Sequence, residues 1–340
     1  MSLARIAMVA TMGLVLAPVA ACGPGSTTAG APGLPRVAIV LDGRANDAGF
    51  SEFGADAVAK LQQEHAIDAQ IRESVTNPAD AEPILRQYAA EGYDLIIGWG
   101  VGFSDAVFRV GAQFPKAHFI AAGGQDVLAR ATANVETWTY DAGQLGYLMG
   151  FIAGSTQLSP VAVVDGEQQP FLEAQWFGFS QGLHAMNPAA KELNPVYTGS
   201  FEDPHKAEQA TVAEIATGAK LIATEPDGAS AGIAAAAKAA GVATVGLAPT
   251  SGDAAKAVNV AWVDVDMVAI LRDWVTRLKD GRFGNKGTTS TITNHSLVPA
   301  DITKVAAAPE LPGDLTQRVA ALADQLAAGK VAIIPWKPGQ

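Results

Sequence analysis

Val37-Ala-Ile-Val-Leu41, followed by Asp42-Gly-Arg-Ala-Asn46-Asp47-Ala-Gly49, is the stretch of this 340-residue chain that decides its fold. A short, uninterrupted apolar run with β-branched residues is typical of a strand buried on both faces of a sheet. The polar loop over 42–49 leads into a helix that we expect to run through about Glu64. Strand, polar loop and helix in this order predict the first unit of a parallel α/β sheet.

The same unit recurs along the chain in two series. The first has strands at 68–72, 95–98 and 118–122 and helices at 78–91 and 104–113. The second series begins after a boundary near 134–141. It has helices at 141–153, 171–185, 204–217 and 228–240, and strands at 161–164, 195–197, 221–223 and 244–246. Helices at 267–279 and 314–328 close the chain. The pattern predicts two doubly wound parallel-sheet lobes: 36–138 (lobe 1, completed by about 260–285) and 139–258 (lobe 2, completed by about 286–340).

The N-terminus has the three parts of a secretory signal. Arg5 precedes an apolar run over 6–17, and small residues precede Cys22, which is the only cysteine of the chain. Val19-Ala-Ala-Cys22 resembles the bacterial lipobox, so we expect a signal peptide at 1–21, lipidation of Cys22 and a flexible tether at 22–35. This places the protein on the extracytoplasmic face of the cell membrane. The alternative is an ordinary secretory signal with a chance cysteine.

The composition excludes several classes of function. The formal net charge is −11, which disfavours nucleic-acid binding because a phosphate backbone is also negatively charged. One cysteine and five scattered histidines rule out a disulfide within the chain and make a zinc site improbable. No nucleophile–base pair or nucleotide-binding loop is found, so we expect neither an enzyme nor a cofactor.

Two facing parallel sheets form a cleft where the carboxyl ends of their strands meet, and ligands bind there. The loops at these ends therefore supply the candidate ligand-binding residues. Some of these residues have a simpler explanation as core aromatics, helix caps or turn formers. The candidates are Asp42, Asn46, Asp47, Phe50, Ser51, Trp99, Gly102, Asp165, Gly166, Trp176, Phe201, Gly228 and Trp262.

The loops also carry a resemblance to a known family. An ordered set of motifs is similar to that of the basic-membrane-protein lipoproteins, also called purine nucleoside receptor A-like proteins. The matching segments are 42–51, 98–106, 114–119, 147–150, 177–182, 197–203 and 327–333. The resemblance spans 36–335 and implies a type I periplasmic-binding-protein fold and a role in an ABC transporter.

The resemblance also implies roles for single residues. In the family's nucleoside-binding branch two phenylalanines sandwich the base, and they correspond here to Phe50 and Phe201. Asp42 falls on a position that contacts the ligand in the family, and Ser51 stands where the family usually has asparagine. Stacking between two rings suits a planar heterocycle.

The chain departs from this family pattern where the ribose is held. Gly246-Leu-Ala248 replaces the expected Gly-Val-Asp, and Ala261-Trp-Val-Asp264 lacks the expected lysine. Gly123-Gly124 stand at the end of the fourth strand, where the family pattern has an aspartate. The stacking pair is therefore kept and the sugar contacts are missing, which leaves the ligand open.

The sequence predicts a monomeric solute-binding lipoprotein that binds a small nucleoside-like or other heterocyclic ligand between its lobes. Its expected partners are the permease and ATPase subunits of an ABC transporter, together with the membrane that holds its anchor. One alternative is a ligand sensor that signals to a membrane protein. A second alternative, an extracytoplasmic hydrolase, would need a catalytic pair that the sequence does not supply.

Overall fold

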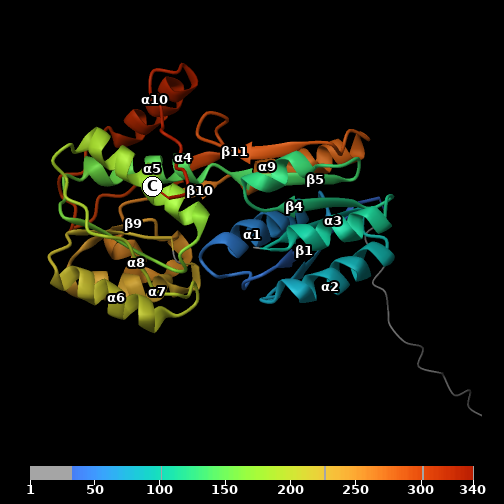
Figure 1. Cartoon of the computed structure of the whole chain (residues 1–340), viewed down its shortest axis with the longest axis horizontal. Coiled ribbons are helices and arrows are strands. Elements are labelled where there is room, and N and C mark those ends of the chain that lie inside the picture. Colours follow the sequence, from blue (N-terminus) through green and yellow to red (C-terminus); the bar gives the residue numbers. More distant parts are fainter. Residues whose placement is uncertain (1–32, 101, 226, 301, 340) are drawn as a thin grey trace, which may run out of the picture.

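The computed structural model describes residues 33–100, 102–225, 227–300 and 302–339. Cys22, the expected signal peptide and most of the expected tether lie outside the described residues. The chain forms two α/β lobes that lie side by side (Figure 1).

Lobe 1 is built on a six-stranded parallel sheet in the order β11-β5-β4-β3-β1-β2. Helices α1 (Phe50–Gln63) and α9 (Met267–Lys279) pack together on one face, and α2 (Pro78–Ala90) and α3 (Ser104–Gln113) on the other. The strands are β1 (Arg36–Leu41), β2 (Asp68–Arg72), β3 (Leu95–Trp99), β4 (His118–Ala122), β5 (Val135–Tyr140) and β11 (Gly287–Ser290).

Lobe 2 has a smaller parallel sheet in the order β7-β6-β8-β9. Its strands are β6 (Val161–Asp165), β7 (Val196–Tyr197), β8 (Leu221–Ala223) and β9 (Ala243–Val245). Helices α4 (Ala142–Ser155) and α5 (Pro170–Met186) cover one face, while α6 (Pro204–Ala216), α7 (Ser230–Ala240) and α8 (Asp253–Val258) lie toward the other. Helices α4 and α5 approach so closely that a Cβ atom on Gly146 would collide with the carbonyl of Gln175.

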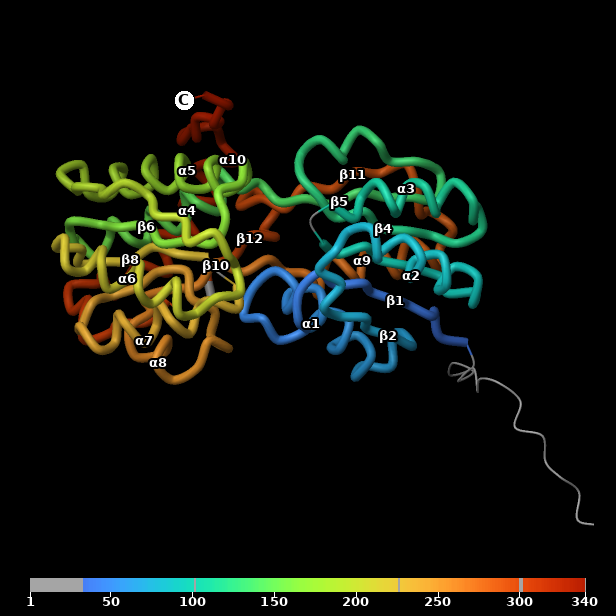
Figure 2. The backbone as a smooth tube through the Cα atoms, turned by 60° about the horizontal axis from the view of Figure 1, so that its bottom comes forward, coloured from blue at the N-terminus to red at the C-terminus, as the bar shows by residue number. Residues whose placement is uncertain are grey.

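The last part of the chain returns to both lobes. Strand β10 (Trp262–Val265) pairs antiparallel with β12 (Leu297–Ala300), and Figure 2 shows both beside the junction of the lobes. Helix α10 (Leu315–Ala327) then contacts α4 of lobe 2. Strand β11 pairs with β5, so lobe 1 extends to Ser290, beyond the expected 285.

The segment near 134–141, which was expected only as the boundary between the two series of strands and helices, contains the buried strand β5. Its polar residue Glu136 is fully buried and accepts hydrogen bonds from the Arg277 guanidinium of α9 and from the backbone N–H of Gly284. Both bonds go to Oε1 and replace part of the hydrogen bonding that this buried charge loses to water, while Oε2 has no partner among the described residues. The partners lie far along the chain, so the local pattern does not reveal the strand.

Candidate functional site

The carboxyl ends of the strands in the two lobes face each other, and two polar contacts join the lobes there. The backbone N–H of Phe50 in lobe 1 donates to Asp227 Oδ1 of lobe 2 at 3.0 Å. Arg44 of lobe 1 forms a 3.4 Å ion pair with Glu202 of lobe 2, and both side chains are about half exposed. The structure therefore describes the lobes in contact with each other.

The loop after β1 holds Asp42 and Ser51 together. Asp42 Oδ1 accepts a hydrogen bond from the Gly43 backbone N–H at 2.9 Å and one from the Ser51 hydroxyl at 3.2 Å. Ser51 is buried at the start of α1, whereas Asp42 keeps part of its surface exposed. The two side chains thus form one polar corner of lobe 1, as their shared motif predicts.

Asp47 is the side-chain cap of α1. The residue before the helix, Gly49, has no side chain to offer, and the carboxylate of Asp47 accepts from the backbone N–H groups of Gly49, Ser51 and Glu52 at 3.0–3.2 Å. A carboxylate is favourable here because it satisfies free N–H groups at the positive end of the helix. Asn46, by contrast, is exposed beside it.

Phe50 belongs to a cluster of three mutually stacked aromatic rings. Its ring lies 4.7 Å from that of Trp99, and the ring of Trp99 lies 4.7 Å from that of Trp138. Both tryptophans are buried, and Trp99 Nε1 donates to the carbonyl of Phe50 at 2.7 Å. Trp99 therefore supports Phe50 from behind, and Trp138, on β5, was missed from sequence because the strand itself was missed.

Four of the predicted residues meet in lobe 2. Asp165, at the end of β6, is fully buried and accepts from Trp176 Nε1 at 3.0 Å and from the Gly166 backbone N–H at 2.7 Å. Burial raises the pKa of the Asp165 carboxyl well above its usual range, and these two hydrogen bonds only partly oppose the shift. The ring of Phe201 packs directly on Gly166, where a Cβ atom would collide with it.

Three more groups belong to this region and were not predicted. Glu225 accepts a hydrogen bond from the Gln175 side-chain amide, and burial raises its pKa to about 7. Burial and the carboxylates of Asp47, Glu225 and Asp42 raise the pKa of Asp227 well above its usual range. Burial, followed by Glu225, Asp227 and Asp165, likewise raises the pKa of the Tyr140 hydroxyl. Glu225 and Asp227 lie in a loop that the sequence marks as part of the cleft, but it does not show which side chains turn inward.

Two predicted glycines have different surroundings. Gly228 faces the Glu202 carboxylate, which a Cβ atom would strike, so it lies at the contact between the lobes. Gly102 has a left-handed φ of +84° and lies exposed beside Pro78 of α2. The structure therefore does not bring Gly102 together with the other predicted residues.

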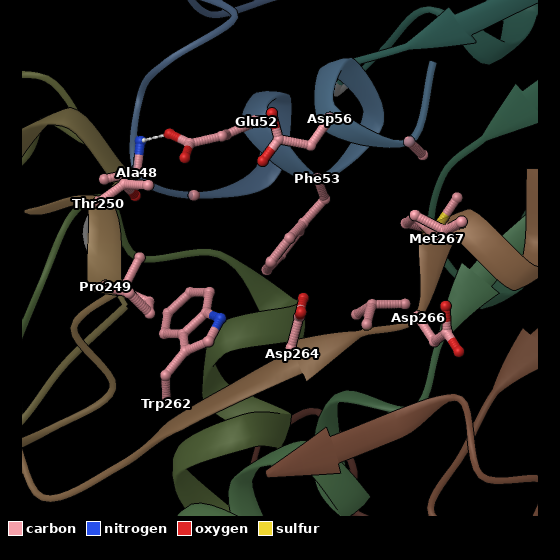
Figure 3. Close-up of a pocket in the computed structure, with 15 residues that line it drawn as sticks. Ala48, Glu52, Phe53, Asp56, Pro249, Thr250, Trp262, Asp264, Asp266 and Met267 are labelled. Atoms are coloured by element: carbon pink, nitrogen blue, oxygen red, sulfur yellow. Dashed lines mark hydrogen bonds between the residues drawn. The ribbon is translucent and has the colours of Figure 1, made fainter. Parts of the chain in front are cut away.

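A groove of about 300 Å³ opens beside Gly49, between α1 and β10 (Figure 3). Phe53 of α1 and Trp262 of β10 approach each other across it, with ring centroids 5.5 Å apart. Pro249 and Thr250, from the 3-10 helix that follows β9, line the lobe 2 side. Trp262 was predicted for the site, whereas Phe53 was not.

The groove coincides with two of the three segments that depart from the expected family pattern. Ala248 lines it where the pattern has aspartate, and β10, which lacks the expected lysine, contributes Trp262 and Asp264. Carboxyl groups surround the groove: Glu52 accepts from the Ala48 backbone N–H at 2.8 Å, and Asp266 caps α9 through the Ala269 N–H at 3.0 Å. Within the described residues, no cluster of metal-ligating side chains occurs and no helix is long and apolar enough to span a membrane.

Comparison with known proteins gives a consistent result. The Bmp family, described as ABC transporter substrate-binding protein PnrA-like, matches residues 34–312. An ABC transporter solute-binding protein from Conexibacter woesei is 37% identical, with a TM-score of 0.80 over 88% of this chain and 99% of that one. An Aeropyrum pernix solute-binding protein shares the fold at 17% identity, with a TM-score of 0.74 over 90% of this chain and 94% of that one. These matches confirm the two-lobed type I periplasmic-binding-protein fold.

More distant named relatives cover less of the chain. Basic membrane protein A of Borreliella afzelii is 27% identical over 172 residues, which is 50% of this chain and 52% of that protein. The chain thus spans about half the length of the Borreliella and Borrelia proteins it matches. The CD4+ T-cell-stimulating antigen of Listeria monocytogenes is 26% identical over 82% of this chain and 75% of its own length.

Proposed function

The chain belongs to the PnrA-like family of ABC transporter substrate-binding proteins, and from this premise we propose that it captures a small ring-containing solute between its lobes and presents it to a membrane permease. The family binds solutes and is not enzymatic. Closure of the two lobes around the ligand creates the surface that the permease recognises. We retain a nucleoside-like or other heterocyclic compound as the kind of ligand.

The groove between α1 and β10 is the observation that supports this proposal most directly. It is lined from both lobes, it lies at the strand ends where ligands bind in such sheets, and it carries the Phe53–Trp262 pair. Aromatic walls with a few convergent polar groups are typical of small-molecule sites. Phe50, one residue beyond the groove-lining Gly49, adds a ring that the buried Trp99 holds in place.

A thermal-shift screen of the protein without residues 1–22 tests the proposal. Nucleosides, free bases, sugars, amino acids and amines are the ligand classes to compare. A ligand present at 100 times its dissociation constant adds about 2.7 kcal/mol to the free energy of unfolding. We expect one ring-containing class to raise the melting temperature, and Phe53→Ala to remove that shift.

Phe108→Ala is the matched control, because Phe108 is also a part-buried phenylalanine but lies on α3, packed with the opposite face of the lobe 1 sheet. This variant is expected to keep the ligand-induced shift. Equal affinities for Phe53→Ala and the unaltered protein would exclude the groove as the binding site.

We further propose that the protein is a monomer anchored by lipid at Cys22. Two or three acyl chains hold a protein firmly on a membrane, since each buried CH₂ contributes about 0.8 kcal/mol. Cys22→Ser should move the protein from the membrane fraction to the soluble fraction of the producing bacterium. Labelled palmitate should be incorporated into the unaltered protein alone; labelling of the variant would exclude this anchor.

A further inference from the structure

Carboxyl groups collect where the lobes meet. Asp165 is the last residue of β6, Glu225 follows β8, and Asp227 lies at the contact with α1. Each of the three raises the pKa of Tyr140, which lies at the end of β5 in the opposite lobe, so all three lie near that hydroxyl. Carboxyl groups are therefore concentrated between the lobes.

One buried acceptor in this region has no partner. Gln175 is fully buried, and its amide nitrogen donates to Glu225, but its Oε1 has no hydrogen bond among the described residues. An unpaired acceptor in a buried position is destabilising, because water no longer satisfies it. An additional donor at this point would satisfy it.

The groove extends this acidic region outward through Gly49. Glu52, Asp56, Asp264 and Asp266 contribute carboxyl groups to the groove, and its described lining contains no lysine, arginine or histidine. Within the described part of the chain, Glu52, Asp56 and Asp266 take part in no ion pair with a basic side chain. Arg44, the basic residue at the contact between the lobes, is already paired with Glu202.

The departure of this sequence from the family pattern also makes the groove less positive. The segment that forms β10 lacks the lysine expected from the family pattern and carries Asp264. The same strand supplies Trp262, whose ring lies opposite Phe53. Aromatic faces attract cations through the negative potential above the ring. Charge, acceptors and aromatic faces therefore favour the same kind of ligand.

We propose that the interlobe site takes a small organic cation, with its ammonium or amidinium group held by the carboxyl groups of Glu225, Asp227 and Asp264 and its apolar part against Phe53 and Trp262. This inference rests on the proposed function and specifies the substrate class of that site. A cation supplies a donor for the unpaired Gln175 Oε1.

Protons should leave the protein when the cation binds. Without a ligand, burial and mutual repulsion favour the protonated carboxyls, so the pKa values of Asp165, Glu225 and Asp227 are raised. A bound cation favours the carboxylate forms instead, so their pKa values fall and protons are released. Affinity must then rise with pH around pH 7, where Glu225 titrates. The other charged or titratable groups near these carboxyls are Asp42, Asp47, Tyr140, Glu173, Tyr197, Glu202 and Arg44.

Calorimetry with matched pairs of probes tests directly whether the ligand must carry a positive charge. Tryptamine is compared with its neutral isostere tryptophol, and choline with 3,3-dimethylbutan-1-ol. We expect at least one cation to bind about tenfold or more tightly than its isostere, and to bind more weakly as the salt concentration rises. Equal binding within both pairs, or no binding of either cation at 10 mM, overturns the proposal.

Glu225→Gln tests the acidic groups and proton release. With a cation that binds, the unaltered protein should release protons, detected as a dependence of the binding enthalpy on the buffer, and bind more tightly at pH 8 than at pH 6. Glu225→Gln should weaken the binding and flatten this pH dependence, whereas Asp253→Asn, at an exposed carboxyl on α8, should leave both unchanged. Unchanged cation binding in Glu225→Gln overturns the proposal.

A neutral probe separates the two proposals. If adenosine raises the melting temperature and no cation does, the cationic ligand class is overturned. The same result supports the proposed solute-binding function. If no class of solute binds and Phe53→Ala behaves like the unaltered protein with all of them, both proposals fail together.

Discussion

The carboxylate of Asp227 in lobe 2 accepts a hydrogen bond from the backbone N–H of Phe50 in lobe 1, with an N–O distance of 3.0 Å. Phe50 is the first residue of α1, and the preceding Gly49 makes no side-chain cap of its own. Lobe 2 therefore satisfies an N–H group at the start of a lobe 1 helix. This one hydrogen bond both joins the lobes and caps α1.

Replacing Asp227 should test this link between the lobes. Asp227→Ala removes the acceptor, and we expect it to weaken closure by about 1 kcal/mol, the usual contribution of such a cap. Asp227→Asn should retain closure, because asparagine keeps an acceptor oxygen and tolerates the left-handed φ of +43° found here. Small-angle scattering reports closure as the radius of gyration. Identical radii for Ala and Asn variants would contradict the prediction.

Gly49→Ala should open the lobes without unfolding either of them. The φ of Gly49 is −160°, which any residue can adopt, but a Cβ atom would collide with Asp227 Oδ1 when the lobes are in contact. We expect a larger radius of gyration and weaker ligand binding, with the unfolding temperature of lobe 1 preserved. An unchanged radius of gyration in Gly49→Ala would show that this collision does not control closure.

Stability should fall as pH rises through the range in which Glu225 titrates. Its pKa is raised from an ordinary 4.5 to about 7, so its contribution is fully present below pH 4.5 and is lost by about pH 7. The loss is about 3 kcal/mol from this group. Unfolding in urea at several pH values should show a flatter profile for Glu225→Gln. Glu310→Gln, at an exposed position, should keep the slope of the unaltered protein.

Trp99 should contribute to stability as well as to the site. Trp99→Ala removes a fully buried ring from the stack and should cost about 3–5 kcal/mol in unfolding free energy. Trp99→Phe keeps an aromatic ring but loses the 2.7 Å bond to the Phe50 carbonyl, and should lose less. Arg44→Ala, which breaks an exposed ion pair, should cost no more than about 1 kcal/mol. Urea titrations rank the three, and an equal effect of all three would contradict this order.

Sequence patterns predicted many of the strands, and the structure brings some of the predicted site residues together. Asp42 with Ser51, and Asp165 with Gly166 and Trp176, do lie together, because each group belongs to one strand end or to the helix that follows it. Trp138 and β5 escaped prediction. The buried Glu136 of that strand accepts a hydrogen bond from Arg277, which is 141 residues away along the chain.

The sequence by itself determined the order of strands and helices, because apolar runs must be buried and their spacing is a local property. It also indicated the family and the loops that line the cleft. Only the tertiary structure decided that Asp227 meets Phe50, 177 residues away, and that Phe53 faces Trp262. Such pairs depend on how the chain crosses between the lobes, and hydrophobic spacing carries no information about that crossing.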